Sequence, residues 1–162
     1  MTNNVTIKPA SKKDVPLILG FIRELAEYEK LLHEVEATEE LLTETLFGDN
    51  AHAEVVIAYL DEQPVGFALF FHNFSTFLGR PGIYLEDLFV SPTVRGKGIG
   101  KMILSYLAKL AIERKCGRLE WWVLDWNEEA IGFYKRLGAQ PMDEWTVQRL
   151  TGSALANLAA EK

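Results

Sequence analysis

Apolar side chains along this chain follow the period of a helix in some stretches and that of a strand in others. In residues 11–28 they recur every three or four positions. The same spacing returns in residues 38–47, 98–114 and 128–137, so these four ranges are expected to be helices. Short alternating or continuous apolar runs predict strands at residues 5–8, 54–60, 65–71, 83–90, 119–124 and 145–150. The tail from Ser153 is compatible with one more helix.

The order of these expected elements is β-α-α-β-β-β-α-β-α-β, with no internal repeat, low-complexity tract or linker. This order predicts an α/β fold with consecutive antiparallel strands in the middle and a parallel crossover after them. A length of 162 residues, 48% of them hydrophobic, suits one domain with a substantial core. Residues 1–162 are therefore expected to form a single domain.

Composition narrows the classes of function. No apolar run approaches the ~20 residues of a membrane span. The start, Met1-Thr2-Asn3-Asn4, lacks the basic and apolar regions of a signal peptide. A single cysteine, Cys116, cannot form an intrachain disulfide, which fits the cytoplasm. The formal net charge of −6 argues against nonspecific nucleic-acid binding and favours a cationic ligand, although an ordinary solubility charge explains it equally well.

One turn has the composition of a phosphate-binding site. Arg95-Gly96-Lys97-Gly98-Ile99-Gly100 lies between an apolar strand and an amphipathic helix. Glycines let a ligand approach the backbone, the helix start offers free N–H groups, and two cations flank them. A dinucleotide-binding fingerprint fails because positions 101 and 103 are not glycine, and a Walker A loop fails because positions 95 and 102 are Arg and Met. A plain loop with a helix cap remains the alternative.

The pattern Arg-x-x-Gly-x-Gly after a strand resembles the coenzyme A-binding motif of the GNAT superfamily of N-acetyltransferases. The resemblance covers about 140 residues. It includes Tyr84 to Val90 before the motif, Asn127 to Gly138 after it, and Glu24 to Glu29, which is similar to the diamine (spermidine/spermine) and thialysine branch. It implies a largely antiparallel twisted sheet flanked by helices, with acetyl-coenzyme A as co-substrate. The cofactor-binding positions it implies are Leu88, Phe89, Val90, Arg95, Gly96, Lys97, Gly98, Ile99, Gly100, Lys101 and Asn127.

Two adjacent carboxylates interrupt the strand at residues 83–90. Neighbouring strand residues point to opposite faces, so Glu86 and Asp87 cannot both lie in a regular sheet core without costly partners. They are either solvated charges on an edge strand or members of a cleft. There, a carboxylate can attract an ammonium and accept its proton. The resemblance makes Glu86 the base and Asp87 an amine-binding residue, and it adds Tyr28, Glu29 and Trp145 to the substrate site. Residues 30–34 are less acidic than in animal diamine acetyltransferases, so the amine is left open.

Tyr134 is the candidate general acid. A phenol with a pKa of about 10 can protonate a departing thiolate, and the resemblance places the proton donor here, although a tyrosine beside Phe133 can also be a packing residue. Asn127 can cap the helix that it precedes, bond the pantetheine arm, or do both. Cys116 follows a helix end, where the dipole raises a thiol pKa, so we expect no acetyl-cysteine intermediate. The histidines are scattered and predict no metal site.

Together these features predict an N-acetyltransferase that moves an acetyl group directly from acetyl-coenzyme A to a primary amine of a small cationic substrate. One alternative is an enzyme of the same fold that acts on an amino acid, a protein N-terminus or a lysine. Another is a non-catalytic acyl-coenzyme A-binding regulator. The expected partners are a small amine and a second copy of the chain, with neither nucleic acid nor membrane.

Overall fold

A computed structural model describes residues 4–162, so Met1 to Asn3, on which most of the signal-peptide reading rests, lie outside it. The chain divides into two compact units, one running to Leu124 and one from Asp125 to Lys162. The first contains β1 (Val5–Pro9), α1 (Val15–Tyr28), α2 (Glu39–Phe47), β2 (Glu54–Leu60), β3 (Gln63–Ser75), β4 (Arg80–Val90), α3 (Ile99–Glu113) and β5 (Leu119–Trp121). The second contains α4 (Glu128–Arg136) and α5 (Gly152–Ala159).

The five strands form one sheet in sequence order, β1-β2-β3-β4-β5. The first four are antiparallel neighbours, and β5 returns through α3 to lie parallel to β4. The mixed α/β fold expected from the sequence is therefore confirmed. The β2–β3 hairpin turns through Asp61 and Glu62 alone, both with positive φ, so the turn is shorter than the gap between the expected strands at residues 54–60 and 65–71. Such a conformation matches the right-handed twist of the flanking strands.

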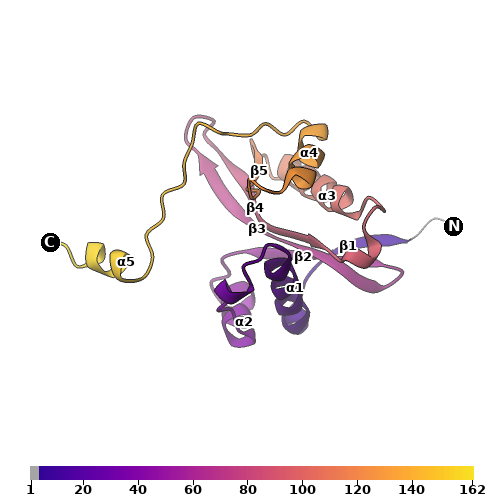
Figure 1. Ribbon diagram of the computed structural model, residues 1–162, viewed down its shortest axis with the longest axis horizontal. Coiled ribbons are helices and arrows are strands. Elements are labelled where there is room, and N and C mark those ends of the chain that lie inside the picture. Colours follow the sequence, from indigo (N-terminus) through magenta and orange to yellow (C-terminus); the bar gives the residue numbers. More distant parts are fainter. Residues whose placement is uncertain (1–3) are drawn as a thin grey trace. The chain divides into compact units, whose positions relative to one another are not determined.

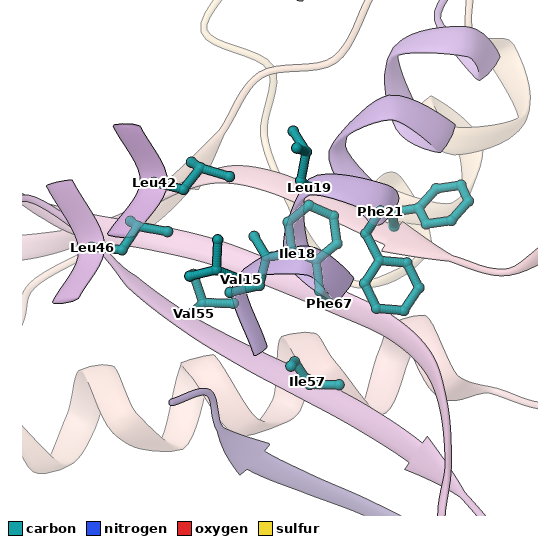
Figure 2. Close-up of a cluster of buried hydrophobic side chains, with 10 residues drawn as sticks. Val15, Ile18, Leu19, Phe21, Leu42, Leu46, Val55, Ile57 and Phe67 are labelled. Carbon is teal, nitrogen blue, oxygen red and sulfur yellow. The ribbon is translucent and has the colours of Figure 1, made fainter. Parts of the chain in front are cut away.

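The main hydrophobic cluster fills the space between the sheet and the two N-terminal helices (Figure 2). The rings of Phe21 and Phe67 stack with their centres 5.5 Å apart, and Phe89 lies 6.1 Å from Phe21. Helix α1 therefore covers one face of β3 and β4. Helix α3 lies on the opposite face and buries its own apolar stripe (Figure 1). The buried members of the main hydrophobic cluster are Val15, Ile18, Leu19, Phe21, Leu42, Leu46, Val55, Ile57, Phe67 and Phe89.

Three expectations about strands are wrong. Residues 145–150 form no strand, although their side chains alternate. The unit from Asp125 to Lys162 contains no other strand, and a strand without a neighbour leaves its N–H and C=O groups unpaired. Strand β5 ends at Trp121 rather than at residue 124, because its pairing with β4 stops there. Strands β3 and β4 also extend beyond the expected ranges 65–71 and 83–90 and leave a turn of only residues 76–79 between them. No helix within residues 4–162 combines the length and apolar content that a membrane span requires.

Candidate active site

The glycine-rich turn has the backbone shape that a phosphate-binding site requires. Gly96 and Gly98 have φ values of 84° and 77°, a left-handed conformation that residues with a Cβ rarely adopt. Gly98 caps α3 without a side chain, so nothing from the cap covers the N–H groups of the first helical turn. Those N–H groups have no acceptor within the helix, and they lie at its positive end. An anionic group such as a pyrophosphate fits there.

Strand β4 presents an open edge next to this turn. Its pairing with β5 covers only Ile83 to Leu85, whereas β4 continues to Val90. Beyond Leu85 the N–H and C=O groups on that side have no strand partner in the described part of the chain. Leu88, Phe89 and Val90 belong to this open edge. An extended ligand with amide groups can pair with such an edge as an added strand would.

The turn is connected to α1 through a cation–π contact. The guanidinium carbon of Arg95 lies 4.9 Å from the centre of the Tyr28 ring, near the end of α1. Arg95 Nε also donates a hydrogen bond to the carbonyl oxygen of Val90, 3.5 Å away. One expected cofactor residue therefore contacts one expected substrate residue. Lys97 and Lys101 are exposed on the same turn and on α3.

A β-bulge determines how the two acids of β4 are directed. Leu69 pairs with Asp87 and Phe70 with Leu85, so Glu86 is an extra residue without a partner on β3. A regular strand would send Glu86 and Asp87 to opposite faces, as expected from the sequence. The inserted residue cancels that alternation, so the expectation is wrong at this position.

Both acids share the face of the sheet that α1 covers. Asp87 lies opposite Leu69, which packs against the main hydrophobic cluster between the sheet and α1. Tyr84 lies opposite Phe71, two residues beyond Leu69, and is therefore on that face as well. Glu86 follows Tyr84 by two residues and takes the same side.

Glu29, at the end of α1, completes a group of three carboxyl groups. Burial, and then the charge of Glu86, raises the pKa of Glu29. Burial, followed by the charges of Glu86 and Glu29, raises the pKa of Asp87 to about 7. A half-buried site with this much negative charge favours a cation, and a bound ammonium would make it easier for Asp87 to ionise. The arrangement can attract an amine and accept its proton.

The same face carries residues that sequence reasoning did not assign to the site. The ring of Tyr84 lies 5.1 Å from that of Phe71 and 5.7 Å from that of Trp122, centre to centre. Burial, and the charges of Glu86, Asp87 and Glu120, raise the pKa of Tyr84. Its phenol is therefore within electrostatic reach of all three carboxylates. Nothing in the sequence pairs Glu120 with Tyr84, because that neighbour relation comes from the β4–β5 register.

Three expected site residues belong to the second unit. Asn127 caps α4, and its Oδ1 accepts a hydrogen bond from the N–H of Ala130 at 3.2 Å, so its capping role is confirmed. Tyr134 lies within α4, with its ring 5.6 Å from that of Phe133. The N–H of Trp145 donates to the carbonyl oxygen of Met142 at 3.2 Å, in the turn region after α4. Their roles toward a ligand remain predictions.

Within residues 4–162, no group of three or more His, Cys, Asp or Glu side chains is arranged to hold a metal ion. Cys116 is a free thiol, partly buried just after α3. The chemistry available in the first unit is therefore that of a backbone anion site next to a carboxylate site on one face of the sheet.

Comparison with known proteins agrees with this geometry. Residues 21–139 match the profile of the Acetyltransferase (GNAT) family. The chain is 40% identical over 168 residues to thialysine N-epsilon-acetyltransferase of Bos taurus, covering 97% of this chain and 98% of the relative. It is 34% identical over 194 residues to L-ornithine N5-acetyltransferase NATA1 of Arabidopsis thaliana, covering 92% and 85%.

Among solved structures, the fold is similar to that of an integron cassette protein from the mobile metagenome of V. cholerae. The TM-score is 0.81 at 33% identity, and the match covers 97% of this chain and 98% of the other. The profile match begins in α1 and ends after α4, so it includes the carboxylates, the glycine-rich turn and Tyr134.

Proposed function

The chain belongs to the Acetyltransferase (GNAT) family and is an N-acetyltransferase that uses acetyl-coenzyme A; on this premise we propose that its acceptor is a primary amine of a small dicationic or diamino-acid substrate of the thialysine, ornithine or polyamine type. The observation that carries the proposal is the group formed by Glu29, Glu86 and Asp87, which lie on one face within electrostatic reach of one another. Relatives named for thialysine and ornithine support the same class of substrate.

In the proposed reaction, Glu86 accepts a proton from the substrate ammonium, directly or through a water molecule. An aliphatic ammonium has a pKa near 10, so this deprotonation is required at neutral pH. Asp87, Glu29, Tyr28 and Trp145 hold the amine and direct its lone pair.

Acetyl-coenzyme A supplies a thioester carbonyl, whose carbon forms the new C–N bond as its C–S bond breaks. The backbone of Leu88, Phe89 and Val90 orients the co-substrate and polarises the acetyl oxygen. The glycine-rich turn from Arg95 to Lys101 binds the pyrophosphate, and Asn127 bonds the pantetheine arm. Tyr134 gives a proton to the leaving sulfur, and the second proton that the nitrogen loses as the amide forms restores the phenol. The turn that would hold the pyrophosphate has the fitting backbone shape, with positive φ at Gly96 and Gly98.

A panel of amines tests this function. The protein and acetyl-coenzyme A would be incubated with thialysine, ornithine, lysine, putrescine, spermidine and spermine, and the free thiol released would be measured. We expect the diamino acids and diamines to be acetylated faster than monoamines of equal length. Thiol release only with a protein N-terminus or a protein lysine would instead favour a macromolecular acceptor, and no release with any amine would favour a regulator that binds acyl-coenzyme A.

A Glu86→Gln variant separates the base from the binding role. The amide removes the proton acceptor but keeps size and polarity, so we expect kcat at pH 7 to fall by about 10²-fold or more while acetyl-coenzyme A binding stays unchanged. The exposed Glu113→Gln on α3 is the matched control and should retain full activity. Full activity of Glu86→Gln would assign the proton to another acceptor.

We also propose that residues 1–162 work as one acetyltransferase domain, in the cytoplasm and as a homodimer, without nucleic acid as a partner. The family match covers residues 21–139 and so includes part of each compact unit, which supports a joint function. The net charge of −6 disfavours binding to phosphate backbones. Light scattering coupled to gel filtration would measure the oligomeric state, and a mass near 18.3 kDa would exclude the dimer.

A further inference from the structure

The carboxylate face continues past Glu86 into an aromatic surface. The rings of Phe71, Tyr84 and Trp122 form a continuous row, with the Tyr84–Trp122 pair nearly perpendicular at 75°. Trp122 is 59% exposed although its neighbour Tyr84 is half-buried. An exposed indole in such a row offers a face on which a cation can rest.

A fourth carboxylate stands at the far end of this row. Glu120 on β5 is directly opposite Tyr84 on β4 and shares its side of the sheet. The amide of Asn73 on β3 donates from Nδ2 to Glu120 Oε1 at 3.2 Å, which fixes the orientation of the carboxylate. Within the described residues no ion pair involves Glu120. Its second oxygen is a possible acceptor for a ligand beside the aromatic row.

The spacing between this carboxylate and Glu86 suits a substrate with two charges. Glu86 lies two residues beyond Tyr84 along β4, about 7 Å, and β5 is about 5 Å to the side, so the backbones at Glu86 and Glu120 are about 9 Å apart. Single bonds of about 1.5 Å give a chain of about five or six bonds a span of about 6–8 Å. A diamine or diamino acid with about four or five atoms between its nitrogens can therefore reach both carboxylates.

We propose that Glu120, together with the exposed face of Trp122, binds the second ammonium of the substrate and so selects diamines and diamino acids over monoamines. This inference rests on the proposed function and adds a specificity-determining residue to it. Glu86 and Asp87 receive the reacting nitrogen, and Glu120 receives the nitrogen that is not acetylated. Tyr84 lies between the two ends and lines the path of the aliphatic chain. Selection by length follows, because only one span satisfies both ends.

Glu120→Gln is the direct test. The amide can still bond to Asn73, but it cannot pair with an ammonium, so the fold is preserved and the charge is lost. Steady-state rates would be compared for matched pairs such as 1,5-diaminopentane and pentylamine, or ornithine and its analogue lacking the α-amino group. We expect kcat/KM for the diamino substrate to fall about ten- to a hundredfold, mostly through KM, and that for the monoamine to change less than about twofold.

Two further variants and a binding measurement complete the design. Trp122→Ala should weaken the diamines selectively and Trp122→Phe should restore them in part, while Glu113→Gln on α3 should behave as the parent. Equal losses for mono- and diamines, or no loss, would overturn the inference while leaving the acetyltransferase activity intact. Calorimetric titration with 1,5-diaminopentane, without acetyl-coenzyme A, keeps the two proposals distinguishable. Binding that depends on Glu120 without any acetyl transfer would support this subsite and reject the proposed function, and binding that ignores Glu120 would reject the subsite.

Discussion

Asp87 is a residue whose position costs the protein stability. Burial and two neighbouring carboxylates raise its pKa from 3.8 to about 7. The folded protein therefore binds more protons than the unfolded chain between about pH 4 and pH 7, so the free energy of unfolding falls as the pH rises through this window. A carboxyl group that is held half-buried beside like charges, at a cost in stability, is typical of a functional site.

Asp87→Asn should therefore stabilise the protein in a pH-dependent way. At pH 8 we expect the free energy of unfolding to rise by a few kcal/mol, because each pKa unit corresponds to about 1.4 kcal/mol. The gain should shrink toward zero as the pH falls to about 4, because the folded protein then holds Asp87 protonated and the unfolded chain begins to protonate it as well. Urea unfolding at pH 4, 6 and 8 measures this. A gain that is the same at all three values would show that packing, and not ionisation, is responsible.

Tyr134 provides a second prediction at the scale of one residue. Replacement by Phe keeps the ring and its contact with Phe133 but removes the hydroxyl. If this hydroxyl protonates the leaving thiolate, kcat should fall by about 10²–10⁴-fold, with unfolding midpoint and acetyl-coenzyme A affinity nearly unchanged. Thiol release, thermal unfolding and binding would be measured on the same sample. Turnover within about threefold of the parent would remove Tyr134 from the mechanism.

At the scale of elements, the start of α3 depends on backbone shape more than on side chains. A Cβ at Gly98 would meet no atom within 4 Å, so space is not the obstacle, but its φ of 77° is unsuited to a β-branched residue. Backbone strain alone therefore decides what a substitution of Gly98 does.

Gly98→Val should accordingly distort the turn and weaken acetyl-coenzyme A binding. Thermal unfolding with and without the ligand measures this, because ligand at about 100 times its Kd adds about 2.7 kcal/mol to the free energy of unfolding. We expect this gain in the parent and little of it in the variant. Gly20→Ala in α1 is the control: it has ordinary φ and free space, so it should keep the response and stabilise the helix by up to about 1 kcal/mol.

The elements with strong periodicity were predictable from the sequence, and those that depend on a neighbour were not. Helices α1, α2, α3 and α4 follow their apolar stripes and caps, and Asn127 is the N-cap that its position suggests. Residues 145–150 have the alternation of a strand but no strand in their unit to pair with. The bulge at Glu86 depends on register with β3, which no local pattern records. Glu120 was missed for the same reason.

At the scale of the whole molecule, the negative charge should guide cationic substrates. The formal net charge is −6, and the carboxylates of the candidate site add a local field of the same sign. We expect kcat/KM for spermidine to fall several-fold between about 20 mM and 300 mM NaCl, because salt screens attraction between charges. A neutral amine such as a hydroxylamine ether should be much less affected. Equal salt effects on both would point to a general change in the enzyme rather than to attraction.

The side chains of a strand alternate between its two faces with a period of two residues. The extra residue at Glu86 shifts this alternation by half a period. Before the shift, odd-numbered residues such as Leu85 face away from α1; after it, Asp87 and Phe89 face toward α1. Regular alternation from Leu85 with Glu86 retained would instead turn Asp87 away from α1 and turn Phe89, which is only 4% exposed, out of the core that it shares with Phe21. Loss of a buried aromatic costs about 3–5 kcal/mol. One inserted residue therefore places Asp87 on the face of Glu86 and Phe89 in the core at the same time.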